Sequence, residues 1–122
     1  RALAKFGPVA FDRVLALAEH GVDEMMVTGA LRTLDQMDQM GTLLPDHRVR
    51  AFDAVRARLS GRQSFIVVRQ AIAMAASSGQ PDLRQRVEAI ASGVEVPDLG
   101  DRKEVATDLR RAARIALDKK RK

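Results

Sequence analysis

The sequence contains no cysteine, tryptophan or tyrosine, and it has four phenylalanines among 122 residues. Without cysteine, the chain has no disulfide, no thiolate metal site and no cysteine nucleophile. The apolar residues are mostly Ala, Val, Leu and Met. This bias favours helices, because strand-rich domains draw on aromatic and β-branched side chains. The composition therefore predicts an all-α protein.

Long hydrophobic runs are also missing. No apolar stretch approaches the ~18–20 residues that a bilayer-spanning helix needs. No secretory signal is visible, and we expect a soluble, cytoplasmic protein without a membrane partner. Arg outnumbers Lys sixteen to five, which hints at a GC-rich bacterial source.

Positive charge is in excess, with a net charge of +5, but much of it lies in one place. The tail "DKKRK" at 118–122 carries most of the excess, and the rest of the chain is close to neutral. A short basic tail of this kind is usually a solvated chain end.

Helical periodicity runs through the whole chain. Apolar residues recur at i, i+3, i+4 and i+7 in the segments around residues 11–18 and 27–34, and Val49, Phe52, Val55 and Leu59 share one face. Glycines at 21, 41, 61 and 79 are expected to end helices in the left-handed conformation. Asp23, Asp46 and the capping boxes "DLRQ" and "DRKE" are expected to begin helices. We predict six helices, over residues 8–20, 23–39, 46–60, 63–78, 82–92 and 101–119.

A repeat relates the first two helix pairs. "AFDRVLA" at 10–16 returns as "AFDAVRA" at 51–57, a shift of 41 residues. The same shift aligns Val27 with Val68 and Ala30 with Ala71, and a third pair fits less well. A period of ~40 residues with two helices is typical of an α-solenoid, in which each unit buries its apolar face against its neighbours.

The segment "FGPVAFDRVLALAEHG" followed by "VDEMMVTGALRTL" resembles a HEAT-repeat hairpin. The resemblance is strongest over residues 6–40, clear over 45–78 and weak beyond 81. Arg69 occupies the place of the arginine common in the second helix of HEAT repeats, whereas Thr28 occupies it in the first repeat. The resemblance implies a single α-α superhelix over 1–122, with hairpins over about 8–40, 45–79 and 82–119. "RALAKFG" at 1–7 resembles the end of a preceding repeat, so we expect a longer parent protein.

The resemblance also directs attention to the second helix of each hairpin, where HEAT-like scaffolds generally meet their ligands. It implies a non-enzymatic scaffold that binds another protein or another domain of its parent chain. The expected partner-binding residues are Arg32, Asp35, Gln36, Arg69, Gln70, Arg110 and Arg114.

The sequence carries no recognisable catalytic or metal-binding pattern, and we expect no cofactor. His20 and His47 have no potential ligand at i±3 or i±4, so we expect exposed or capping histidines. The repeated acids Asp12 and Asp53 could suggest paired carboxylates, but structural ion pairs with Arg13 or Arg56 suit their position better. The methionines are expected to fill the core and its edge, or alternatively to line an apolar groove: Met25, Met26, Met37, Met40 and Met74.

Two arginine clusters support an alternative function. The first comprises Arg48, Arg50, Arg56, Arg58 and Arg62, and the second comprises Arg110, Arg111 and Arg114 with the tail. If both faced one groove they could follow a phosphate backbone, which would make the chain a nucleic-acid-binding module. HEAT-like DNA glycosylases share the repeat plan but use aromatic residues that are scarce here, which argues against that enzyme. We expect the first cluster to be a solvated face.

Overall fold

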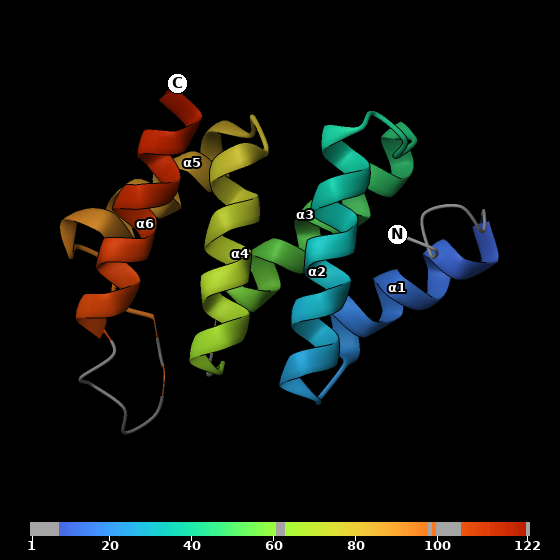
Figure 1. Cartoon of the computed structure of the whole chain (residues 1–122), viewed down its shortest axis with the longest axis horizontal. Coiled ribbons are helices and arrows are strands. Elements are labelled where there is room, and N and C mark those ends of the chain that lie inside the picture. Colours follow the sequence, from blue (N-terminus) through green and yellow to red (C-terminus); the bar gives the residue numbers. More distant parts are fainter. Residues whose placement is uncertain (1–7, 61–62, 98, 100–105, 122) are drawn as a thin grey trace.

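The computed structural model describes residues 8–60, 63–97, 99 and 106–121. Within these residues the only regular elements are six α-helices, so the prediction of an all-α chain is confirmed (Figure 1). The expected N-terminal repeat end at 1–7, the expected capping box at 101–104 and Arg62 lie outside the described residues. The helices are α1 (Pro8–His20), α2 (Glu24–Gln39), α3 (Pro45–Arg58), α4 (Phe65–Ser77), α5 (Pro81–Ser92) and α6 (Ala106–Arg121).

Helix starts are set by two kinds of residue. Asp23 caps α2 as predicted, because its carboxylate accepts hydrogen bonds from the backbone N–H groups of Met25 and Met26, both at 3.0 Å. The predictions for Asp46 and Asp82 are wrong: α3 and α5 begin at prolines, which places both acids in the first turn. Proline is favoured there because its fixed φ suits a helix and its missing N–H would have no partner.

Of the glycines expected to end helices, two adopt the left-handed conformation and Gly21 does not. Gly41 and Gly79 adopt φ of +72° and +75°, so the left-handed ending is confirmed after α2 and α4. Gly21 does not adopt a positive φ, which corrects the prediction at that position. A Cβ atom there would lie 2.5 Å from the carbonyl oxygen of Leu17 and 2.9 Å from Cγ2 of Val27. Gly21 is therefore required by the close approach between α1 and α2.

The helices form three consecutive hairpins, α1–α2, α3–α4 and α5–α6, and each contacts the next. The first helices α1 and α3 pack together, and the second helices α2, α4 and α6 lie side by side and run in the same direction (Figure 1). α4 contacts four other helices, namely α2, α3, α5 and α6. α4 is therefore covered on several sides, in keeping with its nearly continuous apolar sequence.

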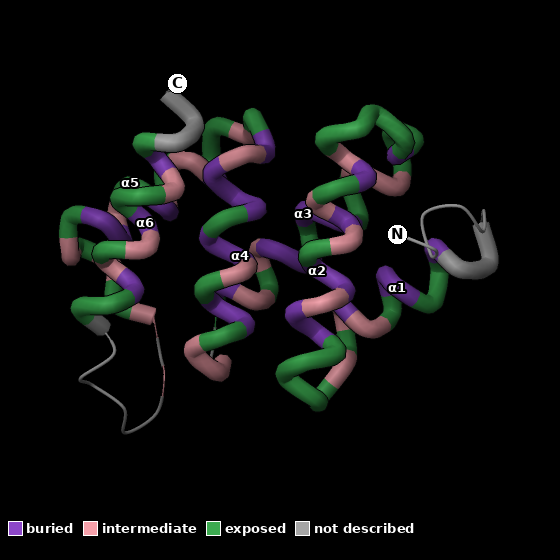
Figure 2. The backbone as a smooth tube through the Cα atoms, in the orientation of Figure 1, coloured by how far each residue is buried: buried purple, intermediate pink, exposed green. Residues whose placement is uncertain are grey.

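The repeated motif supplies core side chains in both hairpins. Phe11 and Phe52 are 4% and 2% exposed, and the aligned pairs Val14–Val55, Val27–Val68, Ala30–Ala71 and Leu31–Ile72 are also buried (Figure 2). Each fully buried Phe, Val, Leu or Ile side chain contributes about 1.5–3 kcal/mol relative to an exposed one. Val49 is an exception, because it lies one turn from the start of α3 and is 60% exposed.

Arginines of later helices close the C-terminal ends of earlier ones. Arg58 of α3 donates hydrogen bonds to the carbonyl oxygens of Ala18 (2.7 Å) and Gly21 (2.9 Å) at the end of α1. Arg86 of α5 donates to the carbonyl oxygen of Leu59 (2.9 Å) at the end of α3. The last carbonyls of a helix have no partner within it and carry its negative dipole end, so a guanidinium satisfies both needs.

Candidate functional site

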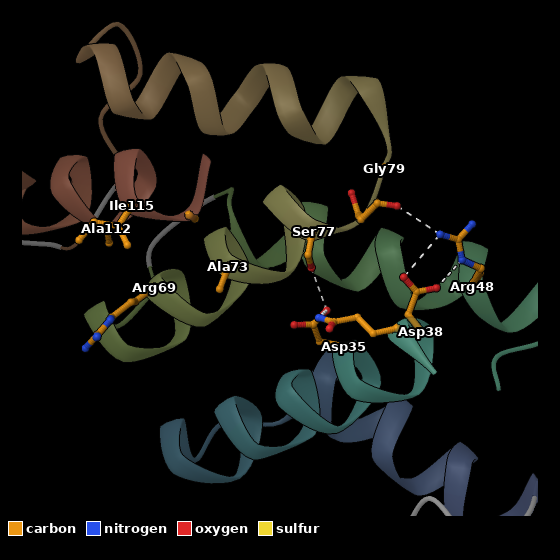
Figure 3. A pocket seen from close by; sticks show the side chains of 12 residues that line it. Asp35, Asp38, Arg48, Arg69, Ala73, Ser77, Gly79, Ala112 and Ile115 are labelled. Atoms are coloured by element: carbon orange, nitrogen blue, oxygen red, sulfur yellow. Dashed lines mark hydrogen bonds and ion pairs between the residues drawn. The ribbon is translucent and has the colours of Figure 1, made fainter. Parts of the chain in front are cut away.

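An open groove of about 910 Å³ runs across the second helices α2, α4 and α6 (Figure 3). The floor is one face of α4, α2 forms one wall and α6 forms the other. The groove is lined by Asp35, Asp38, Gln39, Arg48, Arg69, Ala73, Ser77, Ser78, Gly79, Ala112, Ile115 and Ala116.

The floor follows from the helical period of α4. Arg69, Ala73 and Ser77 are spaced four residues apart, so they point to the same side of the helix. Eight residues of helix span ~12 Å, which separates Arg69 near the start of α4 from Ser77 at its end. Ala73 between them is short and exposed, and Ala112 with Ile115 extends this apolar middle onto α6 (Figure 3). Ile115 is 51% exposed.

Asp35 lies beside the Ser77 end of the floor and is contacted by uncharged donors. The Ser77 hydroxyl donates a hydrogen bond to Oδ1 of Asp35 (3.0 Å), and Nε2 of Gln39 donates to the same oxygen (3.1 Å). Burial raises the pKa of the Asp35 carboxyl above 3.8, and the charge of Asp38 raises it further, while the two hydrogen bonds oppose the shift. Among the described ion pairs, none includes Asp35.

Asp38, one turn further along α2, is in contrast neutralised. Nε of Arg48 forms a short hydrogen bond with Oδ1 of Asp38, and Nη2 of Arg48 donates to the carbonyl oxygen of Ser78 (3.2 Å). The hydrogen bond with Asp38 raises the pKa of Arg48, which stays charged. The guanidinium also lies over the Phe52 ring, 4.9 Å from its centroid. Arg48 therefore ties α2, α3 and α4 together at this end of the groove.

The expected partner-binding residues divide into three groups. Asp35 and Arg69 line the groove as their place on the second helices suggested. Arg32 and Gln36 are exposed on α2, and Gln70 is half-buried on α4, but they do not line the groove.

The other two expected residues face α5. The guanidinium of Arg110 lies beside Gly93, where a Cβ atom would be 3.0 Å from Nη2. Nε of Arg114 donates to the carbonyl oxygen of Ala91 (3.2 Å) at the end of α5. These two arginines therefore do not converge with Arg69 in one groove.

Several groove residues were missed by sequence reasoning. Asp38 and Gln39 follow Asp35 at i+3 and i+4, and Ala73 and Ser77 follow Arg69 at i+4 and i+8, so helical spacing could have found them. Arg48 could not be found in this way, because it reaches Asp38 from a different helix.

The expectation that the first arginine cluster is a solvated face holds for Arg50, which is exposed, and is wrong for Arg48, Arg56 and Arg58, which are half-buried and bridge helices. Arg56 of α3 pairs with Asp53 (2.9 Å) and also with Asp82 of α5 (2.7 Å). Arg50 pairs with Glu19 of α1 (3.4 Å), and Arg48 and Arg58 make the contacts described above. These guanidinium groups are engaged with carboxylates and helix ends.

The repeated acids and the histidines have structural surroundings. Asp53 forms the ion pair with Arg56 that was preferred to a catalytic role, and Asp12 is exposed. The expectation of an exposed or capping ring is wrong for His47, because its ring stacks on Phe11 with the ring centroids 4.1 Å apart. His20 is exposed in the last turn of α1. In the part of the chain that the structure describes, no group of three or more His, Asp or Glu could hold a metal ion.

The methionines divide between core and surface. Met37 and Met74 are buried, as expected of core residues. Met25, Met26 and Met40 are 65%, 55% and 69% exposed, and they do not line the groove. An apolar groove built from methionine is therefore not formed by α2 and α4.

No protein-family model matches the sequence, and comparison with curated proteins and with solved structures finds no significant match. Among the described residues, no helix combines the length and apolar character that crossing a membrane would require.

Proposed function

We propose that the chain is a non-enzymatic HEAT-like repeat scaffold that binds a segment of another protein, or of another domain of its parent chain, in the groove across α2, α4 and α6. The observation that carries the proposal is the groove itself. It is open, it lies on the second helices, and its middle is formed by short or half-exposed apolar side chains. A groove of this form suits a peptide helix or an extended segment.

The HEAT-like architecture is supported by two features of the helices. Equivalent positions of the 41-residue repeat are buried in the first two hairpins, and consecutive hairpins contact through equivalent helices. A stack of this kind buries a continuous core and leaves the outer face of the second helices for a partner.

Nucleic-acid binding is the weaker proposal because of how the arginines are used. Of the two arginines that line the groove, Arg48 is paired with Asp38 and shares the groove with a second acid, Asp35. A phosphate backbone would be repelled by Asp35 and would find one exposed arginine, Arg69.

The proposal is tested by selecting binders from a phage-displayed library of random linear peptides. Ala73→Arg places a long charged side chain on the exposed floor, and Ala57→Arg makes the same change on the exposed side of α3. We expect selected peptides to bind the wild-type chain and Ala57→Arg equally, and to bind Ala73→Arg about tenfold or more weakly. Circular dichroism of both variants checks that each folds.

Two results would contradict the proposal. One is a selection that yields no peptide, and the other is a set of peptides that bind Ala73→Arg as well as the wild type. Gel-shift titration with random-sequence duplex DNA and single-stranded RNA at two salt concentrations tests the weaker proposal, since phosphate-driven binding falls steeply with salt.

A further inference from the structure

The two ends of the groove differ in charge. At one end, the Asp35 carboxylate accepts hydrogen bonds from the uncharged groups of Ser77 and Gln39. At the other end, Arg69 is exposed and forms none of the ion pairs found among the described residues. Figure 3 shows Ala73 between them, with the Arg69 guanidinium directed away from Asp35. The two charges are too far apart to neutralise each other by direct contact.

The other arginine that lines the groove, Arg48, is already engaged. Arg48 pairs with Asp38, whose side chain is 8% exposed, and donates to the end of α4. It therefore leaves the charge of Asp35 without an ion-pair partner. A half-buried carboxylate with uncharged donors alone is an unfavourable arrangement in a folded protein, and a cationic group placed beside it would relieve it.

The directions of α2 and α4 also make the Asp35 end of the groove more negative. α2 and α4 run parallel, so their C-terminal turns lie together at the Asp35 end (Figure 1). The last carbonyls of a helix carry partial negative charge, which adds to that of the carboxylate and attracts a cation. Asp35 and Asp38 both lie near the C-terminal end of α2, where acidic side chains are disfavoured by the helix dipole. Carboxylates at this end of α2 therefore lower the stability of the helix.

From this charge pattern we infer that the groove takes a peptide segment that presents a lysine or arginine side chain to Asp35 and an acidic group to Arg69. Small apolar side chains of the segment would lie between them on Ala73, Ala112 and Ile115. Ser77, which contacts Asp35, lies ~12 Å from Arg69 along α4, so the two anchor points are separated by a distance of that order. Such a distance corresponds to side chains about eight residues apart on a helix or about four apart on an extended chain. This inference rests on the proposed function, because it names what the groove recognises.

The test uses the peptides selected on the wild-type chain, together with variants of the 122-residue chain that carry single substitutions in the groove. Asp35→Asn removes the charge and keeps an oxygen that can accept from Ser77, whereas Asp12→Asn makes the same change on the exposed side of α1. We expect Asp35→Asn to weaken binding about tenfold or more and Asp12→Asn to leave it unchanged. Arg69→Gln should weaken binding, with Arg13→Gln on the exposed side of α1 as its matched control.

A charge exchange separates recognition from a structural role of Asp35. Replacing the basic residue of a selected peptide by glutamate should abolish its binding to the wild-type chain, and Asp35→Lys should restore it. A change in stability alone would not reverse the preference of the chain for peptide charge. Binding of the original peptide should also weaken as the pH falls and Asp35 is protonated. This dependence should be smaller in Asp35→Asn, where only the acidic group of the peptide still titrates.

The outcomes distinguish the two proposals. Peptides that need an open floor but bind Asp35→Asn normally, or carry no basic residue in common, would overturn the charge inference and leave the proposed function standing. A selection without floor-dependent peptides would overturn both. Self-association of the wild-type chain that Ala73→Arg abolishes, measured by sedimentation, would assign the groove to a second copy and would also overturn the inference.

Discussion

Burial raises the pKa of the Asp35 carboxyl above its ordinary value of 3.8, so the folded chain binds a proton there more tightly than the unfolded chain does. The contribution of Asp35 to the free energy of unfolding is therefore most favourable below pH 3.8 and is lost as the pH rises through the elevated pKa of the folded state. We expect Asp35→Asn to melt at a higher temperature than the wild type at neutral pH. The difference should shrink as the pH falls, and thermal melts over a pH series measure it. A variant that melts lower at neutral pH would contradict this account.

Gly21 and Gly29 provide a matched pair of glycines. A Cβ atom at Gly21 would be 2.5 Å from the carbonyl oxygen of Leu17, whereas a Cβ at Gly29 would meet nothing within 4 Å. We expect Gly21→Ala to reduce the free energy of unfolding by about 1–3 kcal/mol, because the α1–α2 turn must shift. Gly29→Ala lies inside α2 and should increase it by about 0.5–1 kcal/mol. Urea titration of both variants makes the comparison, and equal effects would contradict the steric explanation.

At the scale of the helix, Arg58 is expected to stabilise the end of α1 through backbone contacts. It donates to the carbonyl oxygens of Ala18 and Gly21, and burial lowers its pKa. Arg58→Met keeps the length of the side chain but leaves these carbonyls without a donor, so we expect a loss of about 1.5–3 kcal/mol in the free energy of unfolding. Arg50→Met removes the more exposed pair with Glu19, at 3.4 Å, and should cost less than about 1 kcal/mol. Denaturant unfolding would contradict the assignment if the two variants were equally stable.

The helices themselves were largely predictable from sequence, and their ends were less so. Apolar spacing placed all six, because the period of 3.6 residues marks the buried face whatever the neighbouring helix is. Asp46 and Asp82 were predicted as N-caps but occupy the second helical position, because the preceding proline takes the first one. Val49 fitted the apolar stripe of α3, but no helix covers that turn enough to bury it.

The groove was predictable only in part. The resemblance to HEAT hairpins directed attention to the second helices, and Asp35 and Arg69 line the groove. The role of the arginines was not predictable, because Arg58 and Arg86 donate to backbone carbonyls, which every residue type carries. Asp38 and Arg48 are ten residues apart on separate helices, so their pairing depends on how the hairpins turn.

At the scale of the whole molecule, α4 is expected to be the most stable helix. It contacts α2, α3, α5 and α6, and Met74, Ala71 and Ala75 are fully buried in it. Amides exchange slowly where opening requires the loss of many packed neighbours. We therefore expect native-state hydrogen exchange to be slowest in α4 and faster in α1, which contacts α2 and α3. Uniform exchange across the six helices would contradict this ranking.

The arginines that cap the helix ends constrain the order in which the hairpins can fold. The end of α1 is completed by α3, and the end of α3 is completed by α5, so each hairpin depends on the one made after it. During synthesis from the N-terminus, the carbonyls at the end of a hairpin face water until the next hairpin supplies its arginine. Loss of the last hairpin removes Arg86 from the end of α3, whereas loss of the first removes the carbonyl partners of Arg58 and uncovers the faces of α3 and α4 that α1 and α2 cover. Completion of the helix ends should therefore proceed from the N-terminal hairpin towards the C-terminal one.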